Sequence, residues 1–403
     1  MRKSITFLAF LVAWNLGAAQ DLLITNARII DGTGQTIQRG SVVVRDGRIV
    51  SVSEGTSANQ GAVQIDAQGM TVMPGMIDTH IHLLVDPMLD SDEALELWIE
   101  EQLPDVLREY LASGFTAILS NGDYIPAILQ VRQRLNDGEL HGPRLFVSGP
   151  AFTAPGGHPT TTLCKDNRWC RLHLTAEVAD VESARTRVRE LADGGVDAIK
   201  AIYDGREGSD ASVPMLDDTV LSAIAEEARA LDLPTIVHAV TVDDMFKAVN
   251  LGASKLVHTP RRGSVAESQG GGYVLRAASV PVSTTVGVAN TDAEVGALAN
   301  VRQLWDAGVT VAFGTDQTSA RPAAEALAHE VGALSIVLSP AEIITTLTRN
   351  GAAFLDLSDE LGTLEPGKLA DIVIINGDPL ADISDLSNVE IVIQGGRIVV
   401  DNR

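Results

Sequence analysis

The middle of the chain alternates short apolar runs with longer amphipathic stretches, and this alternation constrains the fold more than any other feature. It is typical of repeated β-α units that build a parallel sheet. Eight runs are strand candidates: residues 71–77, 115–119, 144–148, 196–202, 234–237, 255–257, 281–286 and 310–313. Helix candidates include residues 92–112, 176–192, 216–231, 291–307 and 340–350. The sequence therefore predicts an α/β fold of the (β/α)8 barrel type.

Both ends of the chain have the pattern of β structure instead. Residues 21–67 contain short apolar stretches separated by Asp-Gly pairs, which suit tight hairpin turns. Residues 369–376 and 389–400 repeat this style near the other end. We therefore expect two β segments, one at each end, on either side of the long β-α region.

The first residues have the layout of a secretory signal peptide. Arg2 and Lys3 form a basic head, residues 5–16 are almost entirely apolar, and a small-residue stretch ends at Ala19. A membrane anchor is the alternative, but the apolar run is short of the ~20 residues that span a bilayer. We expect residues 1–19 to be removed, which leaves a secreted or periplasmic protein without a membrane segment.

Two cysteines, Cys164 and Cys170, lie six positions apart in a polar stretch. They are too few for a thiolate zinc cluster. Because an exported protein meets an oxidising compartment, we expect a local disulfide between them. A reactive thiol is the alternative, but no basic pattern near either cysteine supports it.

Charge excludes one broad class of function. The chain carries 53 acidic and 30 basic side chains, a formal net charge of -23. The electrostatic field of this negative charge repels the phosphate backbones of nucleic acids. Few aromatic side chains are available to stack on bases. We expect a small-molecule or dipeptide substrate and no nucleic acid. Assembly into a homo-oligomer is compatible with this composition.

Polar side chains follow the apolar runs, where barrel enzymes place their catalytic groups at the C-terminal ends of the strands. The residues at these positions are His80 and His82 in the first unit, Lys200 in the fourth, His238 in the fifth, His258 in the sixth and Asp316 in the eighth. We expect them to converge on one rim of the barrel and form a metal site.

His80 and His82 are two residues apart, so on a strand both point to the same face and can grip a divalent ion. Imidazole suits zinc well. Lys200 lies among Ile and Ala on an expected buried strand, where an ammonium without a partner is costly. Either Lys200 forms a structural ion pair with Asp316, or its amine reacts with carbon dioxide and the resulting carbamate bridges two metals. Spacing alone leaves both interpretations open.

Two motifs near opposite ends of the chain resemble the amidohydrolase superfamily. MPGMIDTHIH at residues 73–82 is similar to that superfamily's first-strand motif, and GTLEPGKLAD at residues 362–371 to its return into a second β segment. The resemblance implies a (β/α)8 TIM barrel, residues 71–359, with a small β-sandwich built from residues 20–70 and 360–403. The strand-4 lysine resembles the binuclear branch that contains prolidase-like and imidazolonepropionase-related peptidases.

The resemblance also implies a role for each polar residue. His80, His82 and Asp316 would hold one of two divalent ions, with zinc expected, His238 and His258 the other, and carboxylated Lys200 would bridge both beside a hydroxide. The loop PGGH at residues 155–158 looks like a strand-3 loop of these enzymes, in which His158 would approach the substrate carbonyl. Such enzymes often have His or Tyr two residues after the strand-5 ligand, where this chain has Val240. Tyr203 and Arg206 are then candidates for the substrate contact.

These expectations lead to one reaction. A metal-activated hydroxide would hydrolyse a C–N amide bond, in a dipeptide or an N-acyl amino acid, with Asp316 as the proton shuttle. The same site could act on a cyclic amide, a lactone or a carbamate ester. A mononuclear deaminase-like site with Lys200 uncarboxylated is a third possibility. A non-catalytic binding protein is disfavoured, because all six ligand positions are filled.

Overall fold

The computed structural model describes residues 21–57, 61–86, 89–205, 212–268, 279–288 and 291–403. The expected signal peptide, residues 1–19, and Arg206 lie outside these ranges. In the described residues no helix has both the length and the apolar character needed to cross a bilayer.

The β-α region forms two parallel sheets. One is ordered β10 (Thr175–Glu177), β9 (Ala151–Thr153), β11 (Ile199–Ile202), β12 (Thr235–His238), β13 (Lys255–Val257), β14 (Val282–Ser283) and β15 (Val311–Ala312). The other is ordered β16 (Gln317–Thr318), β6 (Met76–His82), β7 (Phe115–Ser120) and β8 (Arg144–Val147). Every neighbouring pair within them is parallel. The predicted α/β fold is confirmed.

Single backbone hydrogen bonds connect the two sheets on each side. Thr79 N at β6 donates to Phe313 O just after β15, 2.9 Å away. Asp197 N just before β11 donates to Val147 O of β8, 2.8 Å away. The strands β6, β7, β8 and β11 to β15 therefore follow each other around one centre, although their ladders form two sheets and not one closed ring.

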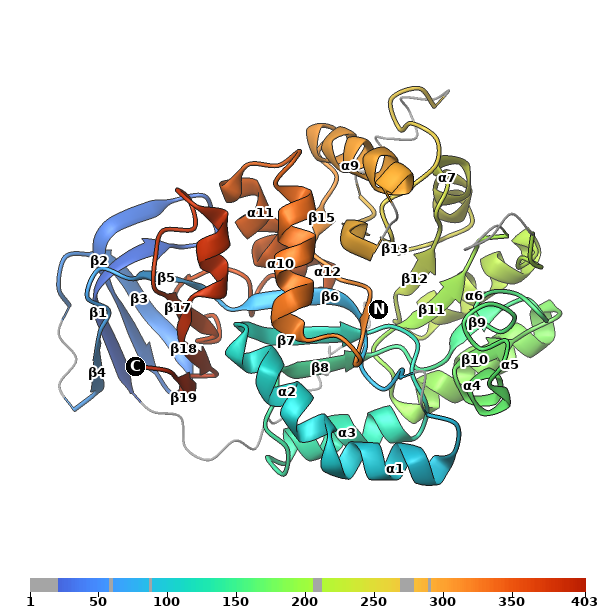
Figure 1. Cartoon of the computed structure of the whole chain (residues 1–403), viewed down its shortest axis with the longest axis horizontal. Helices are drawn as coiled ribbons and strands as arrows, with labels where there is room; N and C mark the ends of the chain where they lie inside the picture. The colour runs from blue at the N-terminus through green and yellow to red at the C-terminus, as the bar shows by residue number, and fades with distance from the viewer. Residues whose placement is uncertain (1–20, 58–60, 87–88, 206–211, 269–278, 289–290) are drawn as a thin grey trace, which may run out of the picture.

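Helices lie between and outside these strands (Figure 1). They are α1 (Asp92–Glu101), α2 (Leu103–Ala112), α3 (Ala127–Asn136), α4 (Arg168–His173), α5 (Val181–Gly194), α6 (Asp218–Ala230), α7 (Val242–Asn250), α9 (Thr291–Asp306), α10 (Ala323–Leu334), α11 (Pro340–Leu347) and α12 (Arg349–Phe354). The prediction of one helix over 92–112 is wrong in one respect, since a second helix begins after Gln102 with a proline in its first turn. Proline suits that position because its missing N–H would have no intrahelical partner there.

The chain ends build a third, eight-stranded sheet, at the left of Figure 1. Its order is β19 (Arg397–Asp401), β18 (Val389–Gln394), β17 (Ile372–Ile375), β5 (Thr71–Pro74), β1 (Leu22–Ile30), β2 (Thr36–Arg45) and β3 (Arg48–Glu54), and β4 (Val63–Asp66) also pairs with β1. Apolar side chains from both ends of the chain share one buried cluster, for example Ile24 with Ile374. The expected sandwich is thus seen as a single hydrogen-bonded sheet around its own core.

The predicted strand over residues 71–77 is two strands that belong to different sheets. β5 pairs with β17 in the end sheet, whereas β6 pairs with β7 in the parallel sheet. Gly75 lies between them, and a Cβ there would overlap the side chain of Thr116. Glycine therefore lets the chain pass from one sheet to the other in close contact with β7.

A buried ion pair also ties the two parts together. The Arg144 guanidinium, at the start of β8, donates to both carboxylate oxygens of Asp371 over 3.0 and 2.9 Å, and both side chains are buried. Gly395 N donates to the same carboxylate. Asp371 ends the motif at residues 362–371, so the last residue of that motif holds the end sheet against the barrel.

Candidate metal centre

The ends of the parallel strands bring the expected metal donors into one cavity of 230 Å³. His80 and His82 come from the end of β6, Lys200 from β11, His238 from the end of β12, His258 from just after β13, and Asp316 from the turn between β15 and β16. All six side chains line this cavity. Parallel strands produce this convergence, because their C-terminal ends meet on one rim.

The imidazole rings form a continuous chain across the cavity. Ring centroids are 5.1 Å apart for His82 and His80, 4.9 Å for His80 and His258, and 4.4 Å for His258 and His238. His258 Nε2 lies 2.7 Å from His238 Nδ1. Ring nitrogens this close point at a common volume, as the ligands of a metal site do.

Asp316 provides the carboxylate of this cluster. Its Oδ1 lies 2.9 Å from His80 Nε2 and 3.1 Å from His82 Nε2, and its Oδ2 lies 3.7 Å from His258 Nδ1. His80, His258 and Asp316 each offer one ligand atom within 4.8 Å of the others. The structure therefore brings together a donor set that fits a divalent cation such as zinc.

The backbone of Asp316 is held in an uncommon conformation. Its φ is +55°, in the left-handed region that residues other than glycine rarely adopt, and its N–H donates to His80 O over 2.8 Å. Asp78 accepts hydrogen bonds from the Thr315 N–H and hydroxyl and from His80 N–H. The turn that carries Asp316 is thus bonded directly to the strand that carries His80, and non-glycine residues in this conformation concentrate at active sites.

Protonation in the cluster suits a cation. Burial, with the charge of Lys200, lowers the pKa of His80 to about 3, and burial holds the pKa of His258 well below its usual value. Burial raises the pKa of Asp316, but His258, His80 and the bonds from His80 and His82 outweigh it and keep this pKa well below the ordinary value. Neutral imidazoles and an ionised carboxylate are the forms that bind metal.

Lys200 is buried, with 2% of its surface exposed, on the face of β11 that lines the cavity. Its charge contributes to the lowered pKa of His80. Its amine therefore lies among the metal donors, as both interpretations of this lysine require.

The loop between β9 and β10 forms one wall of the cavity. His158 lines it, with its ring 5.4 Å from that of His238 and its Nδ1 2.5 Å from Thr162 Oγ1. Leu163 and Leu174 add apolar surface. The structure contains the Cys164–Cys170 disulfide within this loop.

Of the two other expected substrate contacts, only Tyr203 lies in the described residues, and it does not line the cavity. Tyr203 is fully buried and donates its hydroxyl to Asp218, 2.6 Å away on α6, so it points away from the metal donors. Arg206 lies outside the described residues. Val240 is buried and does not line the cavity either.

Sequence reasoning missed two polar residues at the same rim. Asn121 lines the cavity directly after β7, and its side-chain amide donates to Thr79 O over 3.0 Å. Asp204, buried after β11, has a carboxylate oxygen 3.7 Å from His238 Nε2. Both follow an apolar run, so the rule that identified the histidines would also have found them.

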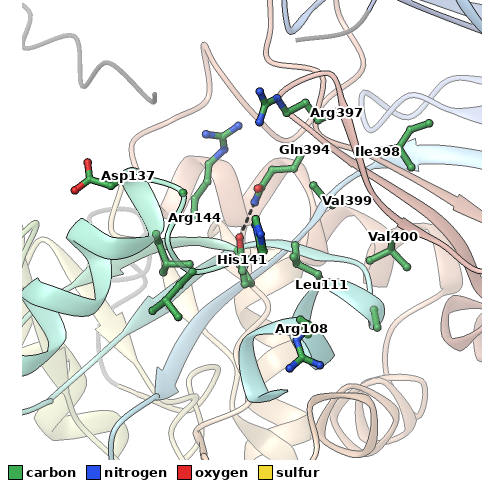
Figure 2. A pocket seen from close by; sticks show the side chains of 16 residues that line it. Arg108, Leu111, Asp137, His141, Arg144, Gln394, Arg397, Ile398, Val399 and Val400 are labelled. Atoms are coloured by element: carbon green, nitrogen blue, oxygen red, sulfur yellow. Dashed lines mark hydrogen bonds between the residues drawn. The ribbon is translucent and has the colours of Figure 1, made fainter. Parts of the chain in front are cut away.

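A second cavity, of 680 Å³, lies at the opposite end of the strands (Figure 2). It is lined by the segment before β8, including His141, and by β18 and β19, including Arg397. None of the six metal-donor residues lines it. The exposed position of His141 agrees with its place in a loop away from the strand ends.

Comparison with known proteins gives consistent matches over most of the chain. The model of the Amidohydrolase family matches residues 71–399. An imidazolonepropionase of Geobacillus thermodenitrificans (strain NG80-2) is 26% identical over 420 residues, covering 91% of each chain. A crystal structure of an amidohydrolase has a TM-score of 0.81 at 26% identity, covering 94% of this chain and 99% of that one. A Xaa-Pro dipeptidase with bound methionine has a TM-score of 0.77 at 23% identity, covering 94% of this chain and all of that one, a likeness of fold.

Proposed function

The chain belongs to the amidohydrolase family and is a hydrolase of carbon–nitrogen bonds, and on this premise we propose an exported binuclear-metal enzyme that hydrolyses the amide bond of a dipeptide or an N-acyl amino acid. One observation carries the proposal: the four histidine donors, Asp316 and Lys200 all line one cavity of 230 Å³. The proposal treats the two parallel sheets as one (β/α)8 barrel joined by the Thr79 and Asp197 hydrogen bonds. The disulfide supports export, since such bonds persist in oxidising compartments.

The metal donors divide into two groups. His80 and His82 approach one oxygen of Asp316, which suits a first ion, and the contact between His258 and His238 suits a second. Lys200, from β11 beside β12, would help to hold both ions as a carbamate, formed when its neutral amine adds to carbon dioxide and releases a proton. When bound, the ions supply a hydroxide nucleophile at neutral pH and polarise the scissile carbonyl.

The residues of the chain then transfer protons and position the substrate. Asp316 accepts a proton on a carboxylate oxygen and passes it to the departing nitrogen. His158 faces the same cavity and is close enough to approach the substrate carbonyl. Leu163 and Leu174 reduce the access of water to the reacting bond.

Turnover of a substrate library tests the proposal. We expect metal-replete protein to release amino acids from dipeptides or N-acyl amino acids, and Asp316→Asn to reduce kcat by at least about a hundredfold while metals stay largely bound. His141→Asn, which changes a histidine far from the cavity, is the matched control. Full activity in Asp316→Asn would refute the proton-shuttle role.

The relatives named imidazolonepropionases favour a cyclic amide as the second candidate substrate. The library therefore includes cyclic amides, lactones and carbamate esters as separate arms. If only these compounds are turned over, the substrate of this site is one of them and not a linear amide.

Metal analysis separates the binuclear site from a mononuclear one. About two ions per chain are expected. One ion per chain in active protein would favour the mononuclear, uncarboxylated interpretation of Lys200.

A further inference from the structure

The metal cavity adjoins a groove that the proposed mechanism does not use. Leu163 and Thr318 line both the 230 Å³ cavity and a neighbouring groove of 620 Å³. Small-molecule sites commonly have volumes of about 300–1,000 Å³, so the metal cavity alone is small and the two together are ample. A substrate whose amide bond lies at the metal donors can therefore extend past Leu163 into this groove.

The groove has an excess of negative charge, and we name it the acidic groove. Its charged lining residues are Asp86, Asp90, Asp166 and Arg168. The exposed Asp166 has a cation only at 3.9 Å, the solvent-exposed Lys165. Among the described residues, no cationic group forms an ion pair with Asp90. Asp90 and Asp166 therefore give this part of the lining an excess of negative charge.

Aromatic rings form another part of the lining. Tyr124 and Trp169 have ring centroids 4.5 Å apart, and Trp169 stacks on His173 at 4.9 Å. The Trp169 indole N–H donates to Asp92 over 2.8 Å, which fixes the ring. A ring face beside carboxylates attracts organic cations through its quadrupole.

The disulfide loop keeps these parts in place. Trp169 lies within the segment that the Cys164–Cys170 disulfide closes, and Leu163 directly precedes that segment. The Asn167 side-chain amide donates to Leu89 O over 2.7 Å, which anchors the loop to the segment that carries Asp86 and Asp90. The groove is therefore preorganised, a condition that lowers the entropy cost of binding.

We propose that the acidic groove is the substrate subsite for a cationic group, such as a lysine or arginine side chain of the dipeptide or N-acyl amino acid. This inference rests on the proposed amide hydrolysis. The reacting amide lies at the metal donors, the substrate passes Leu163 and Thr318, and its cation reaches the carboxylates and aromatic rings beyond.

The test compares kcat/KM for dipeptides that carry lysine, its neutral near-isostere norleucine, or glutamate at either position. At the position that faces the groove, we expect lysine to exceed glutamate by about tenfold, because exposed charge pairs have modest energies. In Asp90→Asn/Asp166→Asn this ratio falls to near one, and in the parent protein it falls with added salt. Asp137→Asn, which removes one carboxylate beside the remote 680 Å³ cavity, leaves the ratio unchanged.

The outcomes separate this inference from the proposed function. Turnover of the norleucine dipeptides with no preference for lysine at either position overturns the groove assignment and leaves amide hydrolysis intact. A preference that survives in Asp90→Asn/Asp166→Asn, or that Asp137→Asn removes equally, also overturns it. No turnover of any dipeptide or N-acyl amino acid contradicts the proposed function itself.

Discussion

At the scale of single residues, Lys200 decides between two chemistries. Among the described residues, it is the one lysine that lines the metal cavity, and it is buried there with the histidine donors. A carbamate would make it an anionic ligand, whereas an ammonium would repel a divalent ion.

We therefore predict that Lys200→Met lowers the metal content from about two ions per chain to one or none, and that reloading of the metal-free parent depends on bicarbonate. Inductively coupled plasma mass spectrometry of dialysed protein measures both. Lys247→Met, which removes a half-exposed lysine on α7, is the control. Normal metal content in Lys200→Met, or loading indifferent to bicarbonate, would contradict the bridging role.

Close packing around Gly314, two residues before Asp316, leaves no room for a side chain at this position. A Cβ there would overlap the Ser283 hydroxyl and contact His80 Cβ at 3.0 Å. Because cores relax only in part, Gly314→Ala would displace His80 and the turn that carries Asp316.

We predict that Gly314→Ala weakens metal affinity at least about tenfold, as displacement of supporting groups does at other metal sites, and destabilises the chain by about 1–3 kcal/mol. Chelator competition measures the affinity. Gly332→Ala, at a glycine whose added Cβ meets no atom within 4 Å, is the control. Equal affinities in the two variants would show that the site does not depend on this close packing.

At the scale of elements, the Arg144–Asp371 pair joins β8 to the end sheet. Removal of one partner from a buried pair leaves an uncompensated charge, which commonly costs about 3–5 kcal/mol. Asp371→Ala should therefore lower the free energy of unfolding by about that amount in urea titrations, whereas Asp401→Ala, at the exposed Arg403 pair, should change it by less than about 1 kcal/mol.

The double variant Arg144→Met/Asp371→Leu distinguishes charge from packing. It removes both charges and keeps apolar volume, so it should recover most of the stability lost in Asp371→Ala. If the double variant is as unstable as the single one, the pair stabilises the fold through the geometry of its hydrogen bonds and not through compensation of charge.

The sequence predicted the elements whose pattern is local and missed those that depend on distant contacts. Apolar runs directly before His238 and His258 predicted their strands, because burial on both faces leaves a continuous apolar signature. The division at Gly75 depends on β17 and Thr116, which no window around residue 75 contains. Tyr203 follows β11 as a site residue should, but its partner Asp218 on α6 turns it away.

At the scale of the whole molecule, two buried carboxyls make stability depend on pH. Burial raises the pKa of Glu330 to about 7 and that of Asp123 to about 6. Glu330 also accepts hydrogen bonds from Val286 N and Gly287 N, so its position is fixed. A raised carboxyl pKa means that the folded chain holds its proton more tightly than the unfolded chain does.

In the metal-free protein, Glu330 should contribute a loss of about 3 kcal/mol of stability as pH rises from about 4.5 to about 7, because below this interval both states hold the proton and above it both release it. The lowered pKa of His80 acts in the opposite direction, since its imidazole is neutral in the folded chain and protonated in the unfolded chain below about 6.5. The effect of Glu330 is therefore measured as the difference in unfolding free energy between the parent and Glu330→Gln, which should fall with pH across this interval. The difference between the parent and Glu325→Gln, exposed on the same helix, should stay constant. A difference for Glu330→Gln that is constant or rises with pH would contradict the assignment.

The end sheet has a consequence for the order of events during synthesis. β5, from early in the chain, pairs on one edge with β17, which is among the last strands to be made. Until the ribosome has completed residues 372–375, β5 has an open edge and Arg144 has no Asp371. The growing chain cannot close its end sheet while it is still being translated. The final assembly of the enzyme therefore begins only when its last strands emerge from the ribosome.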